Sequence, residues 1–153
     1  ERVFVYGEIH RFFLSPFLHL NLGHFQGNMV IFAIFGPLIE RRIGIDDYLV
    51  LFLIGHIGSV VVSSLIEIWH RSASVGLSGV IYAFQAAYLM LIFVRPDSLW
   101  EKIAGYIGFL WIIQDLWRSF WAGVHRRHYD NIDHWGHLGG GLAGMFYVRF
   151  FMG

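Results

Sequence analysis

Residues 72–94 read SASVGLSGVIYAFQAAYLMLIFV and contain no Asp, Glu, Lys or Arg. A helix needs about 20 apolar residues to cross the hydrocarbon core of a bilayer, so this run is long enough for one membrane span. Residues 48–66 form a second uncharged run of the same kind. Over the whole chain, hydrophobic residues make up 56% and charged residues 14%, against roughly 25% charged in soluble domains. This composition predicts an integral membrane protein.

The apolar run that precedes these two covers residues 12–39 and is too long for a single span. Its first part contains Pro16, which is poorly tolerated inside a helix. We therefore expect residues 1–21 to form an interfacial or re-entrant loop that leads into a helix over residues 22–39. The charged residues Glu40, Arg41 and Arg42 are interpreted as an interfacial ion cluster that closes this helix.

Two further apolar runs follow residue 94. The run over residues 103–124 contains Asp115 and Arg118, which a span tolerates only where they face protein or an interface. The last run covers residues 135–148 and is rich in glycine. Strands are not expected, because only helices and closed barrels span lipid and the runs lack the alternation of a barrel. The prediction is an all-α, polytopic membrane bundle with five transmembrane helices in a single domain over residues 1–153.

Charge and cysteine content exclude several functions. The formal net charge is zero, which gives no electrostatic footprint for a nucleic-acid partner. The chain has no cysteine, so disulfides, thiolate metal sites and a Cys nucleophile are excluded. Because the chain begins at Glu1 without Met, we expect a fragment or a processed form.

Polar residues gather at three of the predicted helix ends. In an alternating topology, the N-terminal ends of the first, third and fifth predicted helices lie on the same membrane face. The polar residues at these ends are His24, Asn28, Ser78, Tyr82, His134 and His137. His24 and Asn28 are spaced i, i+4, as are Ser78 and Tyr82, so each pair lies on one face of its helix. The pattern predicts one polar site at similar depth on one side of the membrane.

Small residues on two of these helices indicate how they meet. The third predicted helix carries a stripe of small residues, Gly79, Ala83 and Ala87. The fifth carries a similar stripe, Gly136, Gly140 and Gly144. Such stripes let helix backbones approach closely in lipid. Packing of the two stripes would carry Ser78 toward His137, although close packing alone would also select small residues.

A serine hydroxyl becomes a nucleophile when a base removes its proton, and histidine is the usual base. Ser78 and His137 would form such a pair without a carboxylate, which is a dyad and not a full triad. Asn28, His24 and the backbone N–H of Ser78 are candidate donors to a developing oxyanion. Taken singly, a serine in a span is more often a packing residue and an asparagine an interhelical hydrogen-bonding residue.

A metal site is the rival interpretation of the histidines. His125, His128, His134 and His137 have H-x2-H spacings across a short loop, and nitrogen ligands suit zinc. No HExxH motif is present, so we favour a site with no metal and no cofactor. His56 has no evident partner in the sequence, and no role can be assigned to Asp115.

In the residues described above, and over nearly its whole length, the chain resembles the rhomboid family of intramembrane serine proteases. GLSG at residues 76–79 resembles the GxSG nucleophile motif of that family. HLGGGLAG at residues 137–144 resembles its last catalytic helix, in which a histidine precedes a glycine stripe. HLNLGHFQGN at residues 19–28 resembles its H-x4-H-x3-N motif. The resemblance extends to Tyr82, which matches a tyrosine that packs on the catalytic histidine.

Two flanking stretches extend the resemblance. GPLIERRIG at residues 36–44 resembles a G-x3-E-x3-G stretch, with Glu40 as its acid. EIHRFF at residues 8–13 falls where the family has a Trp-Arg pair, with Arg11 retained and His10 in place of the tryptophan. The family core has six spans, so the five expected here correspond to its second to sixth, and the first helix is absent from this sequence.

The resemblance implies an intramembrane endopeptidase that cleaves single-pass transmembrane proteins within lipid, without a cofactor. It makes Ser78 the nucleophile, His137 the base, and His24 and Asn28 the oxyanion donors. Supporting and packing roles then fall to Tyr82, Gly76, Gly79, Gly140, Gly144, Glu40 and Arg11. The expected location is the cell membrane, with an organelle membrane as the alternative. The competing functions are a catalytically inactive rhomboid-like protein that binds membrane clients, and a channel or transporter.

Overall fold

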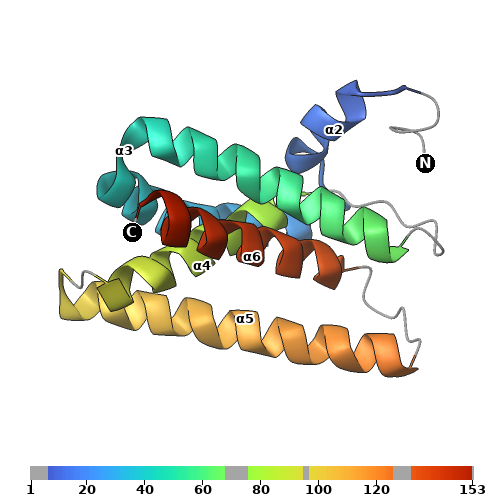
Figure 1. Ribbon diagram of the computed structural model, residues 1–153. Coiled ribbons are helices and arrows are strands. Elements are labelled where there is room, and N and C mark those ends of the chain that lie inside the picture. The colour runs from blue at the N-terminus through green and yellow to red at the C-terminus, as the bar shows by residue number, and fades with distance from the viewer. Residues whose placement is uncertain (1–6, 68–75, 95–96, 126–131, 153) are drawn as a thin grey trace.

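The computed structural model describes residues 7–67, 76–94, 97–125 and 132–152. Within these ranges every regular element is helical, which confirms the predicted all-α fold (Figure 1). The elements are α2 (His10–Leu14), the 3-10 helix η1 (Ser15–Phe17), α3 (Leu22–Glu67), α4 (Ser78–Val94), α5 (Leu99–His125) and α6 (His134–Phe151).

Helix α3 reverses direction at a single residue, Gly44 (Figure 1). Gly44 has φ 81° and ψ 168°, a conformation that glycine adopts without the steric cost of a Cβ atom. It divides α3 into a first limb, residues 22–43, and a second limb, residues 45–67. The prediction that the first helix ends at residue 39 was therefore wrong. The helix continues through the charged residues because one glycine is enough to make the turn.

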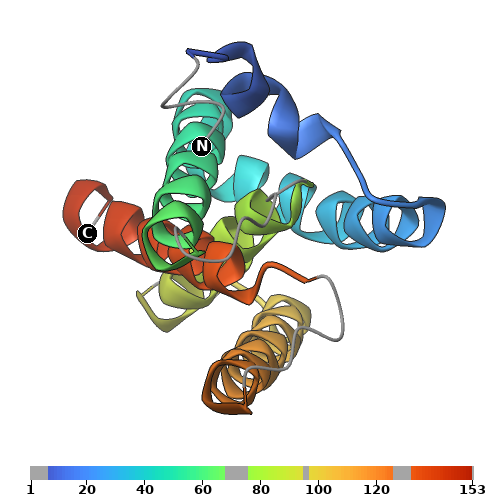
Figure 2. The same ribbon diagram turned by 90° about the vertical axis from the view of Figure 1, so that its right-hand side faces the viewer.

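Helix α4 lies at the centre of the bundle, with the limbs of α3, α5 and α6 around it (Figure 2). Its side chains Ala83, Phe84, Ala87 and Tyr88 are fully buried. Gln85 is the notable polar residue among them and is 1% exposed. Residues 78–94 of the uncharged run thus form the core of the fold.

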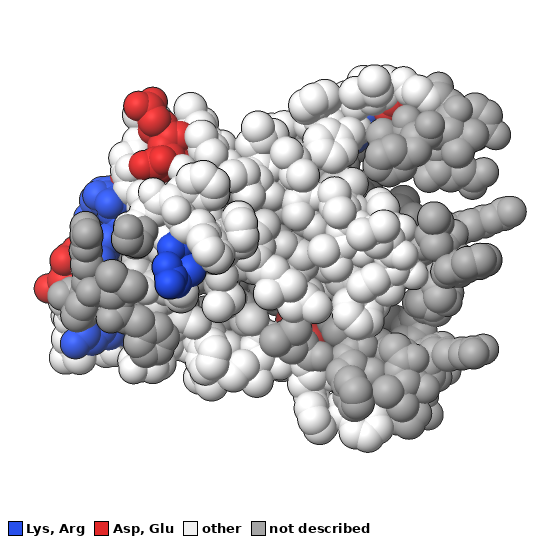
Figure 3. All heavy atoms as spheres, viewed as in Figure 1, with Lys and Arg blue, Asp and Glu red and all other residues white. Residues whose placement is uncertain are grey.

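The outer surface of the bundle is apolar. Many large hydrophobic side chains are exposed on the outer faces, among them Leu22, Val30, Leu49, Leu53, Leu65, Leu110, Leu142 and Phe146. The face drawn in Figure 3 has a broad band with almost no Lys, Arg, Asp or Glu. Monomeric soluble proteins rarely expose continuous apolar surface of this extent. The stretch Leu22–Ile66 is long and apolar enough to cross a membrane, and Ser78–Ile92 forms a shorter apolar helix.

The charged residues near Gly44 link two helices rather than forming a local cluster. The Arg42 side chain is 8% exposed and pairs with Glu101 of α5 at 2.8 Å and with Asp97 at 3.2 Å. Glu40 is exposed, and its side chain makes no ion pair within the described ranges. The predicted cluster of Glu40 with its neighbouring arginines was therefore wrong, because Arg42 pairs with the start of α5 instead.

The segment before α3 is held close to the start of α4. The Nε2–H of His56, on the second limb of α3, donates to the carbonyl of Phe12 at 2.8 Å. The backbone N–H of Gly76 donates to the carbonyl of Ser15 at 2.9 Å. Arg11 is 51% exposed and pairs with Glu8 within the same segment, so the packing role predicted for Arg11 was wrong. His56, which had no evident partner in the sequence, fixes this segment to the bundle.

Candidate active site

Helices α4 and α6 touch along their glycines. A Cβ atom added to Gly140 would overlap the backbone carbonyl of Gly79, and one added to Gly144 would overlap the carbonyl of Ala83. A Cβ atom on Gly79 would in turn overlap Ser59 of α3. The two small-residue stripes therefore face each other, and their contact brings the N-terminal ends of α4 and α6 together.

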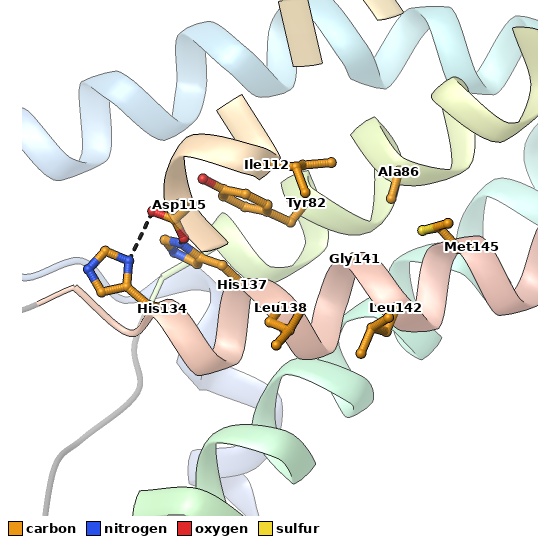
Figure 4. A pocket seen from close by; sticks show the side chains of 10 residues that line it. All are labelled: Tyr82, Ala86, Ile112, Asp115, His134, His137, Leu138, Gly141, Leu142 and Met145. Carbon is orange, nitrogen blue, oxygen red and sulfur yellow. Dashed lines mark hydrogen bonds and ion pairs between the residues drawn. The ribbon is translucent and has the colours of Figure 1, made fainter. Parts of the chain in front are cut away.

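This contact places Ser78 against His137. The Oγ atom of Ser78, the first residue of α4, lies 2.8 Å from Nε2 of His137 in the first turn of α6. The start of α6 is fixed by Asp133, whose carboxylate accepts from the backbone N–H of Gly136 at 2.7 Å. The ring of Tyr82, one turn after Ser78, stacks on the His137 ring with centroids 4.4 Å apart and planes at 11° (Figure 4). The imidazole is thus held flat against Tyr82 with Nε2 directed at the serine.

The carboxylate of Asp115, whose role is not evident from the sequence, completes this group. Asp115 of α5 is 8% exposed, and its Oδ2 lies 2.7 Å from Nδ1 of His137. Its Oδ1 lies 2.9 Å from Nδ1 of His134, as the dashed line in Figure 4 marks. The signal that could have found Asp115 is its place in an apolar run, where a charged side chain is a functional candidate by default.

The predicted oxyanion donors lie beside the turn that precedes Ser78. Gly76 has φ 115°, and a Cβ atom there would lie 2.9 Å from the His24 ring and 3.4 Å from Nδ2 of Asn28. Asn28 is 8% exposed, and its Nδ2 atom is buried without a hydrogen-bond partner among the described residues. A buried donor without an acceptor costs free energy, so Asn28 can gain a hydrogen bond when an oxygen atom enters the site.

The metal ligands that the structure brings together differ from the predicted set. Within the described ranges, Asp115, His134 and His137 offer ligand atoms that lie within 4.8 Å of one another. His128 and the side chain of His125 lie outside the description. Histidine nitrogen and carboxylate oxygen can bind zinc, but the contacts of Asp115 at 2.7 and 2.9 Å have hydrogen-bond lengths. In this arrangement the three residues are therefore joined by hydrogen bonds.

A cavity of about 80 Å³ lies between α4, α5 and α6 next to His137 (Figure 4). Its lining residues are Tyr82, Ala86, Ile112, Asp115, His134, His137, Leu138, Gly141, Leu142 and Met145. The polar members gather at one end, and the remainder is apolar. His137, the partner of Ser78, therefore borders a largely apolar cavity.

Comparisons with known proteins agree on one family. The family model described as Rhomboid domain matches residues 6–153. The chain is 28% identical to Rhomboid-related protein 1 of Caenorhabditis elegans over 150 residues, covering 92% of this chain and 39% of that protein. It is 26% identical to RHOMBOID-like protein 1 of Arabidopsis thaliana over 137 residues, covering 90% of this chain and 33% of that protein.

The alignment with a third relative covers a larger share of that relative's length. The chain is 25% identical to Rhomboid-like protein 11, chloroplastic, of Arabidopsis thaliana over 147 residues, covering 91% of this chain and 51% of that protein. The chain thus spans between about a third and a half of the length of these relatives.

Proposed function

The chain belongs to the rhomboid family, and we propose that it is an intramembrane serine endopeptidase in which Ser78 is the nucleophile and His137 the base. The observation that supports this most is the contact of 2.8 Å between Ser78 Oγ and His137 Nε2. A hydroxyl and an imidazole at hydrogen-bond distance are the pair that nucleophilic catalysis requires. Members of this family are membrane proteins, and the apolar exterior supports a multi-pass integral location.

The proposed reaction proceeds in two halves. Ser78 Oγ attacks the carbonyl carbon of the scissile peptide while its proton moves to Nε2 of His137. The tetrahedral intermediate collapses, the C–N bond breaks, and His137 returns the proton to the leaving amine. Water then hydrolyses the acyl-enzyme by the same proton transfers in reverse. No metal or cofactor takes part in this scheme.

The developing oxyanion requires donors near Ser78. Asn28 Nδ2, the His24 ring and the backbone N–H of Ser78 at the start of α4 are the groups that can supply them. The unpartnered state of Asn28 Nδ2 supports this role, because the amide group is already buried and needs no reorganisation to donate to an incoming oxygen atom.

Single-pass transmembrane proteins are the proposed substrates, because the site lies within a bundle whose exterior is suited to lipid. The test is to place the purified chain in liposomes with a single-pass substrate labelled at both ends, and to identify the products by mass spectrometry. We expect one internal peptide bond to be cut by the natural chain and none by the variant His137→Ala. If the substrate binds to the chain but is never cut, the alternative of an inactive client-binding protein replaces this proposal.

Removing the Asn28 amide should slow the reaction without weakening substrate binding. We expect Asn28→Ala to lower kcat by about 10²- to 10³-fold with little change in KM, because an oxyanion donor acts in the transition state. The matched control is Gly27→Ala on the preceding residue, where an added Cβ atom meets nothing within 4 Å. Steady-state kinetics in liposomes measure both variants, and an unchanged kcat for Asn28→Ala would remove Asn28 from the oxyanion site.

A further inference from the structure

Asp115 is a buried carboxylate in the middle of an apolar helix. Its side chain is 11% exposed, and each of its two oxygen atoms lies against the Nδ1 atom of a different histidine of α6. Burial of a carboxylate is costly unless hydrogen bonds and opposite charge compensate it. Two imidazole N–H donors at 2.7 and 2.9 Å provide that compensation. Both oxygen atoms of the carboxylate therefore contact the start of α6.

We propose that Asp115 is a positioning residue that completes a Ser78–His137–Asp115 triad. This inference rests on the proposed function and adds a third member to the pair derived above. Because a carboxylate accepts hydrogen bonds, it holds the proton of neutral His137 on Nδ1. The lone pair of the imidazole is then on Nε2, which faces Ser78 Oγ at 2.8 Å. This is the tautomer in which His137 can accept the serine proton.

The other contacts of His137 cannot select this tautomer. Tyr82 stacks on the face of the ring at 11°, which fixes the plane but is equally compatible with a proton on either nitrogen. Ser78 can donate to Nε2 or accept from it, since a hydroxyl does both. Asp115 alone among these three neighbours accepts and cannot donate, so it is the group that decides where the proton lies.

Asp115 also acts on the charged state of the base. When His137 takes the serine proton, its imidazolium lies 2.7 Å from a carboxylate in a water-poor interior. The attraction between opposite charges is much stronger there than in water. His134, which holds the second oxygen of Asp115 at 2.9 Å, orients the carboxylate toward His137. The hydroxyl of Tyr82 points toward the same carboxylate (Figure 4).

The kinetic test compares Asp115→Asn with a control on the same helix. We expect Asp115→Asn to lower kcat by about 10²-fold or more with KM within about threefold, because the loss falls on proton transfer and not on binding. Gln114→Ala changes the exposed residue that precedes Asp115 on α5, and it should keep kcat within about tenfold of the natural chain. If both variants lose kcat equally, the loss comes from disturbance of α5 and the proposal is overturned. A kcat for Asp115→Asn close to that of the natural chain also overturns it.

A second measurement reads the proton position in the natural chain itself. In the natural chain with ¹⁵N-labelled histidine, nuclear magnetic resonance in detergent reports which ring nitrogen of His137 carries the proton, and His137→Gln assigns the signal. We expect protonation on Nδ1, and protonation on Nε2 would overturn the proposal. If the natural chain cleaves nothing, the proposed function fails, while this measurement still decides the role of Asp115.

Discussion

Ser78→Ala should abolish proteolysis, with the rate lowered by about 10⁴-fold or more, as expected when the nucleophile of a covalent mechanism is removed. The physical reason is that Ser78 Oγ is the hydroxyl oxygen that lies 2.8 Å from the base nitrogen of His137. Alanine leaves the helix intact but provides no atom that can form the acyl-enzyme. Initial rates of substrate cleavage in liposomes, at equal amounts of folded protein, measure the effect.

Ser63→Ala is the matched control, because it separates chemistry from packing. Ser63 is 4% exposed on the second limb of α3, so it is a buried serine within an apolar helix, as a packing interpretation of Ser78 would require. We expect Ser63→Ala to keep the rate within about tenfold of the natural chain, because a buried hydroxyl typically contributes only about 1 kcal/mol. If the two alanine variants lose the same fraction of activity, Ser78 is a packing residue and not the nucleophile.

Gly140→Ala is expected to have the second largest effect, because it separates the two catalytic helices. The new Cβ atom would overlap the backbone carbonyl of Gly79, which cannot rotate away as a side chain would. We expect α4 and α6 to move apart, with a loss of stability of about 1–3 kcal/mol and of at least about 10²-fold in kcat. Thermal unfolding in detergent and cleavage kinetics measure the two effects.

The neighbouring residue on the same helix supplies the control for this prediction. A Cβ atom on Gly141 would have its nearest contacts at 3.9 Å, an ordinary van der Waals distance. Gly141→Ala should therefore keep or raise the unfolding temperature, because alanine favours a helix over glycine by about 1 kcal/mol. Equal losses of stability in Gly140→Ala and Gly141→Ala would contradict the close contact described between α4 and α6.

The fold and the pair at its centre were predictable because their signals are local. Uncharged runs mark membrane helices one at a time, and alternation of the chain then places the starts of α4 and α6 on the same side. The glycine stripes determine which faces of these helices touch. Ser78 and His137 could therefore be paired from sequence although 59 positions separate them.

The role of Asp115 was not predictable, because it depends on how α5 is rotated and how deep it lies against α6. Asp115 is 22 positions from His137, and the glycines that mark the packed face of α5, Gly105 and Gly108, lie only in its first half. The pairing of Arg42 with Glu101 across 59 positions has the same origin. Both pairs depend on the packing of whole helices, which periodicity within one helix does not specify.

The turn at Gly44 was missed for a different reason. A group of charged residues at the end of an apolar run usually indicates that a helix ends at the membrane surface, and here it was interpreted as an ion cluster that closes the helix. Helical hydrogen bonds continue through such residues as readily as through apolar ones, and one glycine with φ 81° then reverses the chain.

The most direct test of the central claim is to label the purified chain with a fluorophosphonate probe, which reacts with activated serines, and to map the adduct by mass spectrometry. We predict one adduct on Ser78 of the natural chain, and none at that residue in His137→Ala. An adduct on another serine, or cleavage of substrate by a chain whose Ser78 never reacts, would contradict the assignment of Ser78 and His137.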